Sequence, residues 1–188
     1  MQEELFFLRS SEQYLAKELL LYKFGLEKSD KDLQKYPELE QYERHFGSFS
    51  GDTGVYIITD KKVAGAAWVR LLSNGFAFTE ETTPELLFYI KPEFKDRGIE
   101  SKLIEQLFIE ATKIFTQISV SVEVDSTDLN LFKNHGFTII ENSEHLNVLK
   151  IASIKMIKDL DELKIQKEEK HLEEECFKKS FSHERDRF

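Results

Sequence analysis

The sequence predicts an α/β fold, a single domain whose central, mixed and mostly antiparallel sheet is flanked by helices. Two observations support this prediction. Apolar runs of strand length alternate with longer stretches in which apolar residues recur every three or four positions, as on one face of a helix. One pair of strand candidates is joined by a short hairpin connection, whereas a helix separates other strands. No internal repeat is evident at the periods typical of solenoid proteins.

The N-terminal part of the chain predicts a strand followed by a helix. Residues 5–9 are apolar enough for a strand. Ser10 or Ser11 can cap the next helix, because acidic and amide side chains follow within its first turn. We expect Gly25 to end this helix. The apolar side chains on one of its faces are Leu15, Leu19, Leu20 and Phe24.

A second helical stretch is expected over residues 30–46. Pro37 interrupts it, and because proline lacks a backbone N–H we expect a break or a new helix start there. The apolar side of this stretch carries Tyr36, Leu39, Tyr42 and Phe46.

Residues 55–59 and 63–72 predict two strands, joined by a short hairpin turn at residues 60–62. A loop over residues 73–84 follows. Glu80 and Glu81 in this loop, together with Glu85 after it, place three carboxylates near the mouth of the next strand. Such a loop commonly carries function, and these carboxylates could attract a cationic amine.

The stretch from residue 84 to 111 predicts a strand at 86–90, a turn marked by proline and glycine, and an amphipathic helix from Gly98 onward. The first turn of a helix has backbone N–H groups without intrahelical partners, at the positive end of the helix dipole. Lys95, Arg97 and Lys102 surround this turn, so it is a candidate site for a phosphate or pyrophosphate. The alternative is an ordinary strand-to-helix turn with solvated charges.

The C-terminal half of the domain predicts a strand at 118–124, a short helix at 127–135 and a strand starting at 138. The last strand is either 147–151 or 153–158. The composition then changes, because residues 159–188 carry ten acidic and seven Lys or Arg side chains among 30 residues. We therefore expect a domain at 1–158 and a solvated, charged helical extension at 159–188.

Composition narrows the classes of function. The net charge of −9 over 188 residues argues against a general nucleic-acid surface, which would need a basic face. The single cysteine, Cys176, excludes Cys-cluster metal sites, and the five histidines show no paired spacing, so we expect no metal. The first eight residues lack the pattern of a signal peptide, and no run approaches a membrane span. A cytoplasmic protein without a membrane partner is expected.

The run from residue 87 to 103 resembles the acyl-CoA-binding motif of the GNAT superfamily of N-acetyltransferases, a strand followed by a Q/R-x-x-G-x-G/A turn and a helix. Lys95 stands at the Q/R position and Gly98 at the first glycine, whereas Glu100 replaces the last small residue. Residues 61–72 and 118–137 resemble the flanking parts of the family domain. The ending SIKMIKDL is similar to the family's last strand and favours 153–158 for it.

The resemblance implies an acetyl-CoA-dependent N-acyltransferase that moves an acetyl group directly to a primary amine of a small molecule or peptide. It places Glu85 as the base beside the acceptor cleft, and it assigns carbonyl polarisation to the backbone amides of Tyr89 and Ile90. Helices at residues 30–46 would form one wall of the cleft, where Tyr36, Tyr42, Glu43 and His45 are candidate contacts. The implied acetyl-CoA-binding residues are Phe88, Tyr89, Ile90, Lys95, Asp96, Arg97, Gly98, Ile99, Glu100, Ser101, Lys102, Ser126 and Phe132.

Three departures from the family pattern keep an alternative open. Phe132 occupies the position of the family's frequent tyrosine acid, and Ser126 that of its frequent asparagine. Tyr89 or a water would then be the proton donor. Glu100 would bring a carboxylate near the pyrophosphate unless it turns outward, as we expect of an exposed first-turn acid. The alternative is a catalytically weakened GNAT-fold protein that serves as a CoA-binding or protein-interaction module. A free sheet edge and the charged extension are also compatible with a homodimer.

Overall fold

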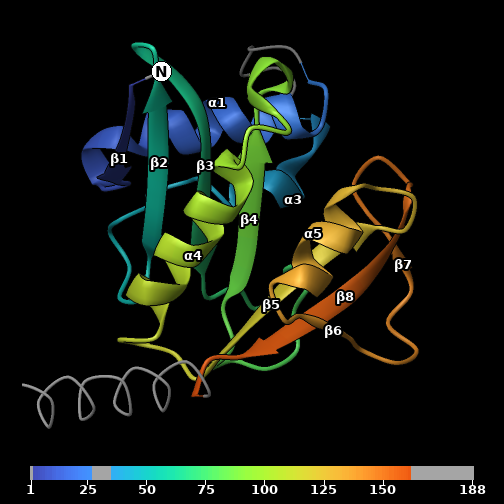
Figure 1. Ribbon diagram of the computed structural model, residues 1–188. Helices are drawn as coiled ribbons and strands as arrows, with labels where there is room; N and C mark the ends of the chain where they lie inside the picture. The colour runs from blue at the N-terminus through green and yellow to red at the C-terminus, as the bar shows by residue number, and fades with distance from the viewer. Residues whose placement is uncertain (1, 27–34, 162–188) are drawn as a thin grey trace, which may run out of the picture.

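The computed structural model describes residues 2–26 and 35–161, so the predicted charged helix lies outside the described residues except for its first three positions. Figure 1 shows a central sheet with helices on both sides. The strands are β1 (Glu3–Phe7), β2 (Thr53–Thr59), β3 (Lys62–Arg70), β4 (Glu85–Ile90), β5 (Gln117–Glu123), β6 (Thr138–Ile139), β7 (His145–Leu146) and β8 (Ala152–Asp159). The helices are α1 (Gln13–Lys23), α3 (Pro37–Glu40), α4 (Ile99–Ala111) and α5 (Asp128–Asn134).

The strands form one sheet in the order β1-β2-β3-β4-β5-β8-β6, with β7 also paired to β8. Every neighbouring pair is antiparallel except β4 and β5, which are parallel. This confirms the predicted mixed and mostly antiparallel sheet. The single parallel pair exists because α4 crosses over between β4 and β5, and a parallel neighbour requires such a crossover.

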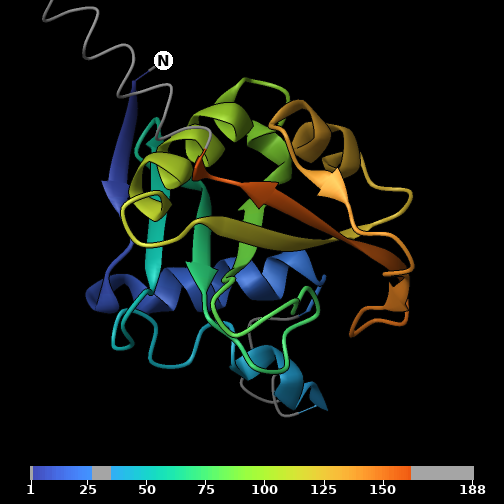
Figure 2. The same cartoon turned by 90° about the horizontal axis from the view of Figure 1, so that it is seen from below.

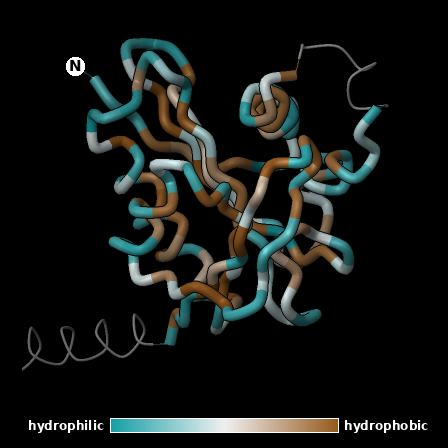
Figure 3. Tube along the Cα trace, turned by 90° about the vertical axis from the view of Figure 1, so that its right-hand side faces the viewer, coloured by the Kyte–Doolittle hydropathy of each residue, from teal (hydrophilic) through white to brown (hydrophobic). Residues whose placement is uncertain are grey.

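Helices cover the two faces of the sheet separately, as the view from below shows (Figure 2). On one face, α1 and the segment after α3 bury Leu19, Tyr42 and Trp68. On the other, α4 and α5 bury Leu103 and Phe132 against the same strands. The hydrophobic parts of the chain accordingly run through the middle of the molecule, and the outer turns are mostly hydrophilic (Figure 3).

The predicted hairpin between β2 and β3 is confirmed, with a tighter turn than expected. Asp60 and Lys61 both have positive φ, at 49° and 66°. Two successive residues with positive φ give the type I′ geometry that matches the twist of the flanking strands. Lys62 therefore already belongs to β3.

The two ends of the domain differ in detail from the sequence prediction. The first strand is Glu3–Phe7 rather than 5–9, and α1 begins at Gln13, after a turn in which the Glu12 carboxylate accepts the backbone N–H of Arg9. At the other end β8 confirms the second of the two candidate strands. Residues 147–151 instead form a turn, held by the Asn147 side-chain oxygen, which accepts the N–H groups of residues 149 and 151.

Candidate active site

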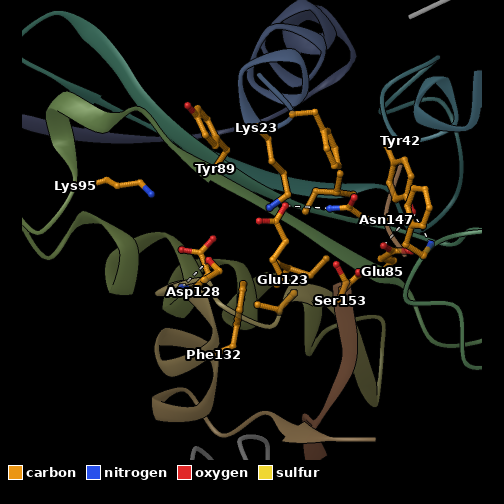
Figure 4. A pocket seen from close by; sticks show the side chains of 17 residues that line it. Lys23, Tyr42, Glu85, Tyr89, Lys95, Glu123, Asp128, Phe132, Asn147 and Ser153 are labelled. Atoms are coloured by element: carbon orange, nitrogen blue, oxygen red, sulfur yellow. Dashed lines mark hydrogen bonds between the residues drawn. The ribbon is translucent and has the colours of Figure 1, made fainter. Parts of the chain in front are cut away.

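The site begins where β4 and β5 separate. Their parallel pairing is confined to Glu85 and Ser119, and the Ser119 N–H donates to the carbonyl of Pro84 at 3.0 Å. Beyond this point the strands diverge (Figure 1), and a cavity of about 200 Å³ lies between them and α1. Its lining includes Lys23, Tyr42, Phe76, Glu85, Tyr89, Lys95, Glu123, Ser126, Asp128, Phe132 and Asn147 (Figure 4).

The main chain of β4 directs alternate residues into this gap. The Lys91 N–H donates to the Ala64 carbonyl of β3 at 2.8 Å. Because hydrogen bonding alternates along an antiparallel pair, the backbone of Tyr89 is also directed to β3, whereas those of Phe88 and Ile90 face the gap. The pair of amides suited to polarise a carbonyl is therefore Phe88 and Ile90, and Tyr89 contributes its side chain instead.

Glu85 is buried at the narrow end of the gap, with 5% of its surface exposed. Its Oε1 accepts a hydrogen bond from the Tyr42 hydroxyl at 3.0 Å, whereas its buried Oε2 has no hydrogen-bond partner among the described residues. Burial raises the pKa of Glu85 to about 7, against the lowering effects of the nearby Ala77 backbone and of Tyr42. A carboxyl group poised near neutral pH is suited to accept a proton.

The loop beside Glu85 leaves room for the carboxylate. A Cβ on Gly75 would collide with Glu85 Oε2, so only glycine fits at this position without displacing it. Of the three acids predicted to gather here, only Glu85 lines the cavity. Glu80 instead accepts hydrogen bonds from the side chains of Thr82 and Thr83 within the exposed loop.

Only part of the expected acceptor wall reaches the cavity. Tyr42 lines it, as does Phe76, whose ring stacks on Tyr42 with centroids 6.1 Å apart. Tyr36, Glu43 and His45 do not. The buried carboxylate of Glu43 accepts a hydrogen bond from Gln13 of α1 and so joins two helical segments.

The turn before α4 provides a second, adjoining cavity of about 200 Å³. Gly98 starts the helix with φ 76°, a left-handed conformation that favours glycine, and a Cβ there would meet nothing within 4 Å. Lys95 lines both cavities; its backbone N–H donates to the Pro92 carbonyl at 3.3 Å, whereas its ammonium group makes no hydrogen bond or ion pair with any residue that the structure describes. The other predicted residues at this second cavity are Phe88, Ile90, Asp96, Glu100 and Ser101.

The predicted surroundings of this turn need corrections. Glu100 does not turn outward, because its Oε1 accepts the Asp96 N–H at 2.9 Å and so occupies one donor of the loop. Lys102 pairs with Glu3 of β1, and the Arg97 guanidinium lies over the Phe94 ring, 5.6 Å from its centroid. Arg97, Gly98, Ile99 and Lys102 line neither cavity, and Ile99 is fully buried in the core.

The opposite wall of the gap holds the two remaining departures from the family pattern. Phe132 is buried, and its ring packs edge-on against Phe88 with centroids 5.9 Å apart. Ser126 lines the cavity, and its hydroxyl oxygen accepts the N–H of Asp128. Phenylalanine has no proton to give to a leaving group, and the Ser126 oxygen serves as an acceptor at the start of α5.

Sequence analysis did not identify Lys23 as a site residue. It ends α1 and donates a hydrogen bond from Nζ to the Phe88 carbonyl at 3.3 Å, inside the gap. Its spacing was the available signal, because Lys23 lies four residues after Leu19 and so on the apolar face of the predicted helix. Glu123 and Asn147, joined by a 3.0 Å hydrogen bond, were also missed, since nothing local distinguishes them.

A central sheet that opens between two parallel strands, with a glycine turn and a helix N-terminus at the opening, defines the acyl-CoA N-acyltransferase (GNAT) fold. Comparison with solved structures agrees. A GNAT-family acetyltransferase from Streptococcus pneumoniae gives a TM-score of 0.62 at 17% identity, covering 84% of this chain and 99% of that one.

Two further matches contain the expected co-substrate. Salmonella typhimurium yncA, in a structure with its cofactor acetyl-CoA, gives a TM-score of 0.62 at 19% identity, over 85% of this chain and 95% of that one. A GNAT-superfamily phosphinothricin acetyltransferase from Sinorhizobium meliloti, in complex with acetyl-CoA, gives a TM-score of 0.60 at 15% identity. The match covers 85% of this chain and 89% of that one. No protein-family model and no curated protein sequence matches the chain. At these identities the matches show a shared fold.

Two features are absent from residues 2–26 and 35–161, the ranges that the structure describes. No group of three or more His, Cys, Asp or Glu side chains there is arranged to hold a metal ion. No helix within the same ranges has the length and apolar character needed to cross a membrane.

Proposed function

We propose that this protein transfers an acetyl group from acetyl-CoA to a primary amine of a small molecule or peptide, with Glu85 as the base. The observation that carries this proposal is the placement of Glu85. Glu85 lies where β4 and β5 pair, its carboxyl group has a pKa of about 7, and one buried carboxyl oxygen has no hydrogen-bond partner in the part of the chain that the structure describes. An amine nitrogen entering the cavity would give that oxygen its missing donor.

The residues of the gap suit the rest of the chemistry. When bound, acetyl-CoA supplies an activated thioester carbonyl. The gap-facing N–H groups of Phe88 and Ile90 would orient that carbonyl, and Lys95 with the first turn of α4 would hold phosphate. Glu85 would take a proton from the ammonium form of the acceptor, so that a neutral amine attacks. A cytoplasmic location and a homodimer remain predictions.

The test combines binding and turnover. Titration with acetyl-CoA by calorimetry, followed by a free-thiol assay against a panel of primary amines, should give binding and amine-dependent thiol release. Glu85→Gln should reduce kcat/KM about 10²- to 10⁴-fold while acetyl-CoA affinity stays within about twofold. Glu81→Gln, an exposed acid of the same loop, is the control. The proposal is contradicted if the parent protein does not bind acetyl-CoA, or if Glu85→Gln keeps full activity.

A second function, a CoA-binding or protein-interaction module without transfer, is favoured by two features, of which Glu100 argues against tight acetyl-CoA binding and Phe132 against transfer. Glu100 already occupies the Asp96 N–H in the turn that would hold the pyrophosphate. Phe132 adds to this, because it cannot donate a proton. Binding of acetyl-CoA without thiol release toward any amine of the panel would favour this second function.

A further inference from the structure

Lys23 places an ammonium group inside the gap between β4 and β5. The residue is half-buried at the C-terminus of α1, and its Nζ bonds to the Phe88 carbonyl at 3.3 Å. Figure 4 shows the side chain descending from α1 into the cavity and ending close to Glu123, with Tyr89 on one side and Phe132 below. This position follows from helix geometry, because Lys23 continues the buried face that carries Leu19.

The charged groups that act on Lys23 come from β4, β5, the turn before α4, and α5. Burial lowers the pKa of Lys23 from its usual 10.5; Asp128 and Glu123 raise it, Lys95 lowers it and Glu85 raises it. The C-terminal end of the α1 dipole also favours a cation. The net effect is a lowered pKa, so the Lys23 ammonium gives up its proton more readily than that of an exposed lysine.

Lys23 and Phe132 meet at the same residue of β4 from opposite sides. Lys23 bonds to the backbone carbonyl of Phe88, and the Phe132 ring packs against the Phe88 ring. Both residues line the same cavity. On the α5 side of the gap, Phe132 stands at the position of the family's tyrosine acid and has no proton to give, whereas the α1 side presents the ammonium group of Lys23.

We propose that Lys23 is the acid of the transfer reaction and returns a proton from Nζ to the sulfur of the departing thiolate. This inference rests on the proposed function. Glu85 accepts one proton from the acceptor ammonium, the amine nitrogen bonds to the carbonyl carbon, the carbon–sulfur bond breaks, and Nζ protonates the sulfur. Glu85 then releases its proton to solvent, and the second proton that the attacking nitrogen loses as the amide forms passes through solvent to the neutral Nζ of Lys23. The sum is one amide, one thiol and one proton from the ammonium and the thioester.

Four variants test the assignment. Lys23→Met should lower kcat about 10²-fold, the lower end of the range for a positioned acid, and remove the alkaline fall of the kcat profile. Lys23→Arg keeps the charge but holds its proton too tightly, and should be nearly as slow. Adding Phe132→Tyr to Lys23→Met should restore kcat at least about tenfold, because it supplies a donor on the other wall. Lys62→Met, at the exposed start of β3, is the control.

Binding gives a second readout that needs no turnover. An ammonium beside the sulfur stabilises a thiolate, so the affinity for CoA relative to desulfo-CoA, measured by calorimetry, should rise with pH in the parent protein. Lys23→Met should abolish this rise. If Lys23 were merely structural, Lys23→Met would leave the pH dependence of the relative CoA affinity unchanged. Adding Phe132→Tyr to Lys23→Met would then not restore kcat.

The outcomes separate the two proposals. If the parent turns over and Lys23→Met matches it, or is slowed with an unchanged pH profile and no rescue, the role of Lys23 is refuted and the acetyltransferase proposal stands. If mass spectrometry finds Lys23 itself acetylated in amounts matching the enzyme, it is a nucleophile and not the acid. If the parent binds acetyl-CoA without turnover on any amine, both proposals fail.

Discussion

The Tyr42 hydroxyl donates a hydrogen bond to Oε1 of Glu85 at 3.0 Å, and the hydroxyl oxygen of Tyr42 in turn accepts the Phe76 N–H at 2.7 Å. These two hydrogen bonds connect Phe76, in the loop after β3, through Tyr42 to Glu85, the proposed base. Burial, followed by the charge of Glu85, raises the pKa of Tyr42 well above its usual value, so the hydroxyl keeps its proton and remains a donor. The bond favours the charged form of Glu85 and partly offsets the burial that disfavours it.

Tyr42→Phe removes this hydrogen bond and should therefore raise the pKa of Glu85. A hydrogen bond to a charged group contributes about 1.5–3 kcal/mol, so the acidic limb of the kcat/KM profile should shift upward by about one to two pH units. The pH profile of thiol release measures this shift. Tyr14→Phe, a change at a residue 64% exposed, is the control. An unchanged acidic limb in Tyr42→Phe would show that Glu85 is not the group that titrates.

The buried carboxyl of Glu85 also predicts how stability varies with pH. Its pKa in the folded protein, about 7, lies above the ordinary value of 4.5. The folded state therefore binds this proton more tightly, and the contribution to stability is complete below pH 4.5 and is lost as the pH rises through about 7. The free energy of unfolding should fall by at most about 3 kcal/mol from this group.

Urea unfolding at several pH values between 4.5 and 8 measures this dependence. Glu85→Gln, which cannot ionise, should flatten the curve over that interval, whereas Glu81→Gln should leave it unchanged. Parallel curves for Glu85→Gln and the parent protein would mean that Glu85 is charged in both states across this interval.

The sequence predicted those parts of the fold that depend on neighbouring residues. The strand, glycine turn and helix around Gly98 were predicted because apolar spacing and backbone freedom are local properties. The choice of residues 153–158 over 147–151 for the last strand came from the resemblance, and β8 confirms it.

The arrangement of charges in the site could not be predicted in the same way. Lys102 pairs with Glu3, 99 residues away in sequence, and this removes it from the turn at Gly98. Glu85 was expected beside the acceptor cleft, but its burial could not be predicted, because it depends on a contact with Tyr42, 43 residues away in sequence. The cavity itself exists because β4 and β5 stop pairing after a single residue pair, which depends on packing across the whole sheet.

Removing the Glu100 carboxylate should strengthen acetyl-CoA binding. Glu100→Ala frees the Asp96 N–H and deletes a negative charge at the turn. Like charges about 4 Å apart repel by about 1 kcal/mol in water and about 4 kcal/mol near a protein surface, so affinity should rise at least about fivefold. Calorimetric titration measures the change, with Glu105→Ala, an exposed acid of the same helix, as the control. Binding no tighter than that of the parent would show that Glu100 does not oppose the pyrophosphate.

The segment that carries Tyr42 is held to the sheet by a buried ion pair. Arg70 of β3 donates to both carboxylate oxygens of Asp52 at 3.0 Å, and its Nη1 donates to the carbonyls of Gln41 and Arg44 at 2.9 and 2.7 Å. The two side chains are only 4% and 1% exposed, so removing one partner leaves the other charge buried and uncompensated.

Asp52→Asn should therefore lower the free energy of unfolding by about 3–5 kcal/mol, as measured in urea. The matched control is Arg44→Met, which breaks the exposed pair of Arg44 with Glu40 and should cost less than about 1 kcal/mol. Because Arg70 also fixes the backbone next to Tyr42, Asp52→Asn should shift the acidic limb of the activity profile as Tyr42→Phe does. If Asp52→Asn lowers stability but leaves that limb in place, the ion pair anchors the fold without positioning the base.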